Sequence, residues 1–180
     1  MQRARRPPSP IHARARRLVA VAGAAVGWLA CGADVQAQER KNYFDDPFVQ
    51  VTAALAGCPV PAGPAITLEE MRSQAHGRVD RGTTCFRSGR CRLPNSYLYD
   101  KELVPRVERH VGQDESFAAS SVWVMGQRRW IYLMGCVASQ EQSDAIERAV
   151  RNIDDVEAVI NELMVGVDGV PRYPTVRPAQ

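Results

Sequence analysis

The stretch VWVMGQRRWIYLMGCV, residues 122–137, constrains the fold more than any other part of the 180-residue chain. Its two halves are rich in β-branched and aromatic residues and flank a short polar segment, which predicts an antiparallel hairpin. Such a hairpin ordinarily alternates apolar and polar residues, because one face meets the core and the other meets water. Here both alternating sets are apolar. The second face therefore needs a covering of its own.

We place the turn at Gln127-Arg128, which pairs Val124 with Ile131 on the face that meets the core. Large side chains then occupy the opposite face as a candidate binding surface: Trp123, Met125, Trp130, Tyr132 and Met134. Three coverings compete for this face. We favour residues 43–99 of the same chain, and the alternatives are a lipid surface and a protein partner, including a second copy in a homodimer.

The first 37 residues have the order of a secretory signal. Residues 1–17 carry six arginines and no acid, residues 18–30 carry no charge, and a stretch of small residues follows. We expect cleavage after Ala37 and release into the periplasm. Lipid attachment at Cys31, giving an outer-membrane lipoprotein, and an uncleaved anchor are the alternatives. The apolar run is shorter than the roughly 18 residues that a membrane span needs.

The basic charge of the chain lies in this leader. Cleavage would remove six arginines and one aspartate, leaving 17 basic and 19 acidic residues and a net charge of −2 instead of +3. The charge balance therefore gives no reason to expect nucleic-acid binding.

Four cysteines follow the leader, and an even number in an exported chain favours disulfides: Cys58, Cys85, Cys91 and Cys136. Ser88-Gly89 favours a turn that lets Cys85 approach Cys91, which would leave Cys58 to pair with Cys136. The two other connectivities stay open. Zinc binding is the alternative use of the cysteines, but no CxxC spacing supports it.

Residues 38–99 form an N-terminal extension with little periodicity. We expect a short helix over 49–56 and a helix of about ten residues from a capping box at Thr67–Glu70 to Gly77. A cross-linked loop over 78–96 should follow. It holds five arginines that are candidate contacts for an anionic ligand: Arg78, Arg81, Arg87, Arg90 and Arg92. We favour solvated charges that pair with Asp80 and Glu69/Glu70 over a phosphate site.

Residues 100–166 carry a recognisable signature. Pro105 predicts that the first helix becomes regular only near Val104; the hairpin, a helix over 140–153 and a strand over 156–165 follow. WIYLMGCVAS resembles the V-x-L-x-G-x-V-x-S strand of BON domains (bacterial OsmY and nodulation), and DVEAVINELMV resembles their G-V-x-x-V-x-N-x-L-x-V ending. Arg129 and Asp155 stand where that family has glycines.

The resemblance implies an α+β fold, a small αββαβ sandwich. From the residues themselves we expect residues 38–99 to extend it through disulfides, and the proline-rich segment 167–180 to form a flexible tail. It also implies an envelope protein, in some members osmotically induced, that binds phospholipid surfaces or envelope partners. We find no nucleophile motif and no cofactor motif, and expect no enzyme. A module that makes only protein contacts is the main alternative, and a thiol-redox protein is a distant one.

Overall fold

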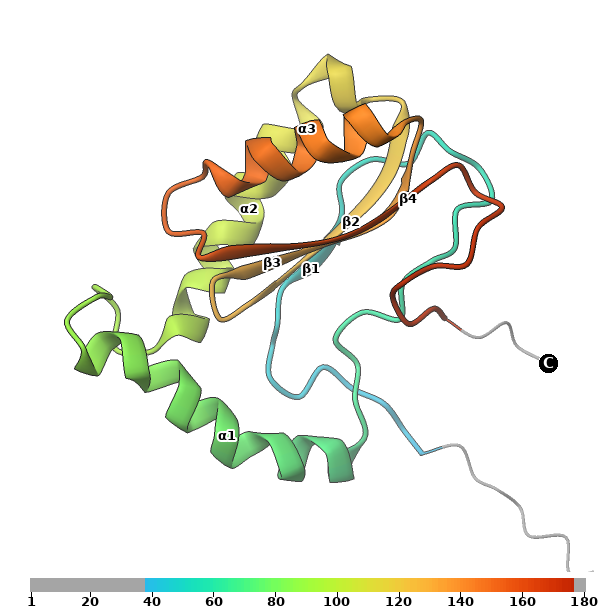
Figure 1. Ribbon diagram of the computed structural model, residues 1–180. Helices are drawn as coiled ribbons and strands as arrows, with labels where there is room; N and C mark the ends of the chain where they lie inside the picture. The colour runs from blue at the N-terminus through green and yellow to red at the C-terminus, as the bar shows by residue number, and fades with distance from the viewer. Residues whose placement is uncertain (1–37, 177–180) are drawn as a thin grey trace, which may run out of the picture. The chain divides into compact units, whose positions relative to one another are not determined.

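The computed structural model describes residues 38–176 as three α-helices and a four-stranded sheet (Figure 1). The predicted leader, with Cys31 and Ala37, and residues 177–180 lie outside the described residues. In chain order the elements are β1 (Phe48–Gln50), α1 (Leu68–Arg87), α2 (Asp100–Gly112), β2 (Ser120–Gln127), β3 (Trp130–Val137), α3 (Gln140–Arg151) and β4 (Ala158–Val165).

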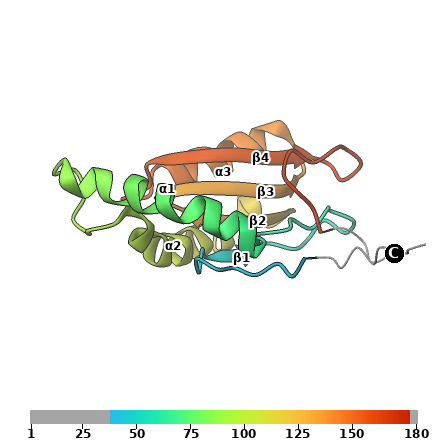
Figure 2. The same ribbon diagram turned by 90° about the horizontal axis from the view of Figure 1, so that it is seen from below.

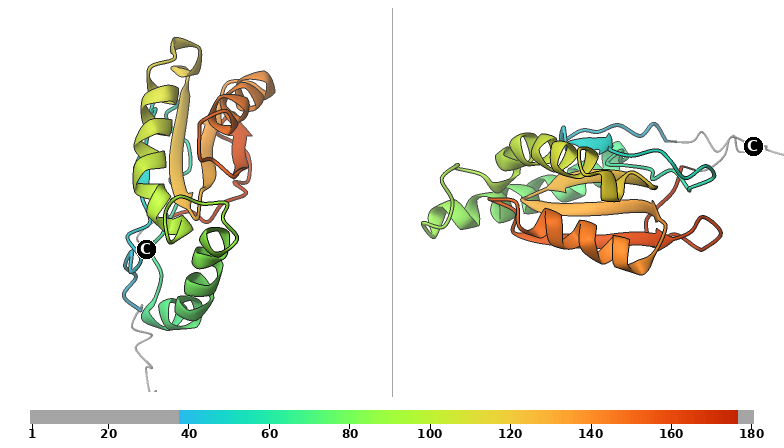
Figure 3. Two further views of the ribbon diagram at one scale, coloured as in Figure 1. Left: turned by 90° about the vertical axis from the view of Figure 1, so that its left-hand side faces the viewer. Right: turned by 90° about the horizontal axis from the view of Figure 1, so that it is seen from above.

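The sheet has the order β1-β2-β3-β4. β2 pairs antiparallel with both β1 and β3, while β4 runs parallel to β3 after a crossover through α3. Both α2 and α3 lie on one face of the sheet (Figures 1 and 3). The side chains buried between these layers are those of the predicted inner face and the two helix stripes: Val122, Val124, Ile131, Leu133, Leu103, Val107, Ile146 and Val150. The predicted α+β sandwich is confirmed.

The hairpin register differs from the prediction by two residues. Val124 pairs with Leu133 instead of Ile131, and the turn lies at Arg128-Arg129. Both turn residues have positive φ, 60° and 66°, as a two-residue type I′ turn requires. Because side chains alternate with a period of two, this even shift leaves every side chain on its predicted face.

The helix α2 begins four residues earlier than predicted. A 3₁₀ helix, Ser96–Tyr99, leads directly into Asp100, so the first turn of α2 is already set when the chain reaches Pro105. Proline there removes one amide donor. The expected late start at Val104 is therefore wrong.

The extension departs most from the prediction. The capping box is confirmed, since Thr67 Oγ1 accepts from the Glu70 amide at 3.2 Å and the Glu70 carboxylate accepts from the Thr67 amide at 2.7 Å. The helix it opens, however, continues past Gly77 to Arg87. The buried residues in the second half of this helix are Arg78, Gly82 and Cys85. They form no apolar stripe from which the sequence could predict a helix. Segment 49–56 is not a helix, because β1 pairs with β2 there.

Gly82 is required where α1 meets the 3₁₀ helix. A β-carbon at this position would lie 2.4 Å from Asn95 Oδ1, so any larger residue would displace the Asn95 side chain, whose Oδ1 accepts from the Tyr97 amide. The helix α1 lies on the side of the sheet opposite α2 and α3, and its C-terminal end extends past the hairpin turn (Figure 2).

The outer face of the hairpin is covered at the end that lies farthest from the turn. The predicted disulfide Cys58–Cys136 is present, as is Cys85–Cys91. Cys58, Trp123, Met134 and Cys136 form a second buried cluster with Tyr173. The favoured covering by the extension is thus confirmed for the segment around Cys58.

The C-terminal tail completes this cover, against the expectation that it is flexible. The Tyr173 hydroxyl donates to the Pro59 carbonyl at 2.8 Å. The Ala62 amide donates to the Pro174 carbonyl, and the Val176 amide donates to the Val60 carbonyl. A tail that is paired in this way is part of the fold as far as residue 176.

Candidate functional site

The predicted aromatic surface on the sheet is largely internal. Trp123 and Met134 are buried, and Met125, Trp130 and Tyr132 are half-buried. The five residues therefore do not form one exposed patch. What remains accessible is the part of this face nearest the hairpin turn.

Arg78 is a structural residue. Both of its terminal nitrogens donate to the Asp46 carboxylate, Nη1 at 2.9 Å from Oδ2, and both side chains are buried. Its guanidinium also stacks on the rings of Phe44 at 4.1 Å and Tyr97 at 4.0 Å. A charge paired and stacked on all sides is not available to a ligand.

The other four arginines were expected to pair with Asp80 and Glu69/Glu70, and this expectation is wrong. Arg92 pairs with Glu102, and lies 3.6 Å from the Asp155 carboxylate. Asp80 pairs with His76 at 3.3 Å, and Glu70 with Arg40 at 3.2 Å. Asp80 and Glu70 thus pair with residues other than the five arginines.

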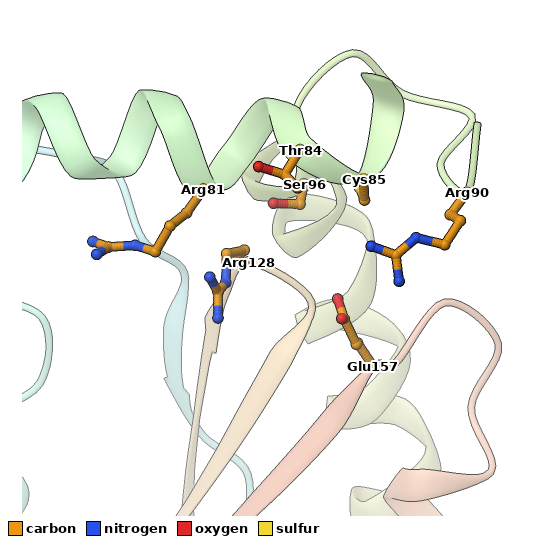
Figure 4. Close-up of a pocket in the computed structure, with 7 residues that line it drawn as sticks. All are labelled: Arg81, Thr84, Cys85, Arg90, Ser96, Arg128 and Glu157. Carbon is orange, nitrogen blue, oxygen red and sulfur yellow. The ribbon is translucent and has the colours of Figure 1, made fainter. Parts of the chain in front are cut away.

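Two of the five predicted arginines, Arg81 and Arg90, line a cavity of about 270 Å³ beside the hairpin turn (Figure 4). Its walls come from α1, the disulfide loop, the 3₁₀ helix, the turn and the start of β4. The remaining lining residues are Thr84, Cys85, Ser96, Arg128 and Glu157. In Figure 4, Arg90 and Glu157 extend toward the space under α1, whereas Arg81 extends along the helix, away from them.

The cavity is rich in positive charge. Among the described residues Arg81, Arg90 and Arg128 form no ion pair. Glu157 is the one acid in the lining, and its carboxylate lies 3.9 Å from Arg129 Nη1, outside the lining. Such an excess of guanidinium groups suits an anion with several acceptor oxygens.

A buried hydroxyl in the same lining has no partner. Ser96 is 2% exposed, and its Oγ forms no hydrogen bond within the described part of the chain. Buried polar atoms are nearly always paired, because leaving one unpaired costs about 1–3 kcal/mol. The cavity wall therefore contains a buried hydroxyl without a hydrogen-bond partner.

Asp100 fixes the turn that carries Arg128. Its carboxylate accepts from the Arg128 amide at 2.6 Å and from the Arg129 amide at 2.7 Å. Burial raises the pKa of Asp100 to about 6, against the effect of these two amides, which lower it. Arg129 Nε donates in turn to the Asp155 carbonyl at 2.8 Å, so the turn is held from two sides.

Sequence reasoning missed Ser96, Arg128 and Asp100. Asp100 lies 28 residues before the turn that it holds, and Ser96 and Arg128 belong to different elements that meet only in the fold. No local motif marks any of them. Asp155, which stands where the BON family has glycine, adopts a left-handed conformation with φ 72°.

The end of α1 beyond the cavity combines apolar and basic side chains. Val79 is 60% exposed and Phe86 46% exposed, and they lie seven residues apart on one side of the helix. Arg87 is exposed beside Phe86 and does not line the cavity. We call residues 79–90 the α1 tip. Within residues 38–176, no helix has both the length and the apolar character needed to cross a bilayer.

Comparison with known proteins agrees with the topology. The family model of the BON domain matches residues 99–166, which span α2 to β4 and the αββαβ order found in the fold. No curated protein matches the chain. BON domains are associated with phospholipid binding and occur in proteins of the bacterial envelope. Residues 99–166, folded as this unit, are therefore a BON domain within the chain.

Proposed function

We propose that the protein is an exported, non-enzymatic envelope protein that attaches to anionic phospholipid surfaces through the α1 tip. The association of BON domains with phospholipids supports the ligand class. The two disulfides are compatible with an oxidising compartment such as the periplasm.

The observation that carries the proposal is the composition of the α1 tip. Phe86 and Val79 are exposed. The same segment carries Arg81, Arg87 and Arg90, which form no ion pair among the described residues. Insertion of one apolar side chain contributes about 1.5–3 kcal/mol, and each arginine near an anionic surface about 1 kcal/mol. Neither contribution alone gives stable attachment, so both are needed.

Vesicle co-sedimentation tests the proposal. The protein should sediment with vesicles that contain anionic phospholipid at low salt, and remain in solution with neutral vesicles or at high salt, because screening weakens the arginine contribution. Phe86→Ala should weaken binding about 10-fold or more, and Arg87→Gln about 5-fold.

Arg148→Gln is the matched control, since Arg148 is an exposed arginine on α3, on the other side of the sheet. It should bind as the wild type does. If the wild type stays in the supernatant with every anionic composition at low salt, attachment to lipid is excluded.

The second candidate is an assembly module that contacts only proteins. The half-buried Met125, Trp130 and Tyr132 near the hairpin turn would then face the partner. Such a module would remain in solution in the vesicle experiment, and its tip variants would behave as the wild type does. The same measurement therefore separates the two candidates.

A further inference from the structure

We propose that the cavity between α1 and the hairpin turn is a binding site for a phosphomonoester dianion. This chemistry is found in the headgroup of phosphatidic acid and in small soluble phosphates. Only the lipid source of the ligand rests on the proposed function. The cavity residues that carry the argument are Arg81, Arg90, Arg128 and Ser96.

Charge selects the ligand class. Three guanidinium groups and one carboxylate line the cavity, and that carboxylate lies beside Arg129. The lining thus has two positive charges in excess. A phosphomonoester carries nearly two negative charges at neutral pH, whereas a phosphodiester carries one. Arginine forks also match the tetrahedral arrangement of phosphate oxygens.

Ser96 provides the independent observation. Its buried Oγ lacks a hydrogen-bond partner, and it lies in the cavity wall beside Thr84 (Figure 4). Because its Oγ has almost no accessible surface, a phosphate oxygen reaches it only after the Ser96 side chain rotates toward the cavity. The oxygen then accepts from the hydroxyl, which removes the cost of leaving it unpaired. A purely structural serine in this position would be expected to bond to the neighbouring backbone.

The cavity wall is held in place by elements on each side. The disulfide Cys85–Cys91 closes the loop that carries Arg90, and Asp100 holds the turn that carries Arg128. Arg81 is the exception, because its Nη1 folds back toward Gly77, 3.3 Å from the place of a β-carbon there. Ligand entry therefore requires a rotation of the Arg81 side chain, and the Arg128 guanidinium, which lies 4.6 Å from the centroid of the Trp130 ring, has to turn toward the ligand.

The size of the cavity limits what enters. About 270 Å³ lies just below the range of about 300–1,000 Å³ that is typical of small-molecule sites. A phosphoryl group with its glycerol oxygen fits this space, and the acyl chains of a lipid would remain outside. The exposed Phe86 lies in the last turn of the same helix.

The test compares monoester and diester lipids. The full chain, expressed and recovered from the periplasm of a bacterial host with both disulfides formed, is titrated with phosphatidylcholine vesicles that carry either phosphatidic acid or phosphatidylglycerol. The two sets are matched in zeta potential. The wild type should prefer phosphatidic acid about 10-fold, the amount expected from one or two charge-assisted hydrogen bonds.

Arg90→Gln and Ser96→Ala should each reduce this preference to about 3-fold or less, and Arg148→Gln should retain it. Ser96→Ala should melt at the wild-type temperature or above it, because it removes an unpaired buried hydroxyl. Loss of preference in this variant is then not a loss of folding. Variants that keep the full preference would overturn the proposal.

Inorganic phosphate distinguishes the sources of the ligand. If it raises the melting temperature over chloride of equal ionic strength and competes with phosphatidic acid, the site accepts soluble phosphates as well. A preference for phosphatidic acid without these effects assigns the site to the lipid headgroup. Equal binding to both vesicle sets, with no phosphate effect on melting, refutes the site.

The failure of the proposed function has a different signature. In that case no vesicle binds the protein, yet phosphate still raises the melting temperature of the wild type and not of Arg90→Gln. This result would support the phosphate site and refute attachment to membranes.

Discussion

At the scale of single residues, Asp100 links the stability of the fold to pH. It is buried beneath the hairpin turn, and its carboxylate accepts both turn amides. Two arginines in left-handed conformation make this turn costly on its own. The carboxylate therefore substitutes for the glycine or asparagine that a type I′ turn ordinarily contains.

We predict that stability falls as pH rises from about 4 to about 6. The pKa of Asp100 is raised from 3.8 to about 6 by burial, so the folded protein binds a proton in this range that the unfolded chain releases. The stability that Asp100 contributes is greatest below its pKa in the unfolded chain. It is lost as the pH rises through its pKa in the folded protein, and the loss is at most about 3 kcal/mol. Urea unfolding at a series of pH values measures it.

Asp100→Asn should flatten this dependence, because the amide does not titrate. It should also lower the free energy of unfolding by about 1–3 kcal/mol, since one turn amide then faces an NH₂ group. Asp154→Asn, at an exposed position, is the control and should keep the wild-type slope. An unchanged slope in Asp100→Asn would show that another group titrates.

At the scale of elements, the two disulfides differ in the length of chain that they close. Cys58 and Cys136 are 78 residues apart, and Cys85 and Cys91 are six apart. A disulfide lowers the conformational entropy of the unfolded chain, and this effect increases with the length of the loop that it closes. The longer bond also joins the extension to β3, so it holds two parts of the fold together.

We predict that Cys58→Ala/Cys136→Ala costs about 4 kcal/mol and Cys85→Ser/Cys91→Ser about 2 kcal/mol of unfolding free energy. Chemical denaturation of the two double variants and the wild type at one pH gives both values. The reverse order would indicate that the short bond acts mainly through the folded state, by holding the end of α1.

The elements also differ in how far the sequence predicts them. The hairpin faces follow from alternation alone, and the capping box marks the start of α1 at Thr67. The register depends on Asp100, which no local pattern connects to the turn. The end of α1 depends on a buried ion pair and on the close packing of Gly82 against Asn95, contacts that leave no hydrophobic period.

For the site, the sequence identifies the type of residue but not the arrangement. Five arginines were predicted as candidate contacts, and two of them, Arg81 and Arg90, line the cavity. Arg78 and Arg92 are engaged by acids from other segments. Only the fold brings Arg128 and Ser96 to the remaining two, because each comes from a different element.

At the scale of the whole molecule, the family unit is not self-sufficient. Residues 99–166 have a complete inner core, but their outer face buries Trp123, Met134 and Cys136 only with the help of Cys58 and Tyr173. Both of the latter lie outside the unit. Extension and tail are therefore structural parts of this protein.

We predict that residues 99–166 expressed alone will self-associate and bind a hydrophobic dye, whereas the full chain will not. The exposed outer face exceeds what an isolated domain tolerates. Light scattering after size exclusion measures the association, with Cys136→Ser in the short chain to exclude cross-linking. A monomer without dye binding would mean that the outer face repacks.

The nesting of the two disulfides also has a consequence for biogenesis. The bond Cys58–Cys136 encloses the bond Cys85–Cys91, and synthesis delivers these cysteines in chain order. Until residue 136 emerges, the partners available to Cys58 among residues 38–176 are the two that belong to each other. A cell that makes this protein must therefore delay the oxidation of its first cysteine or correct it by isomerisation afterwards.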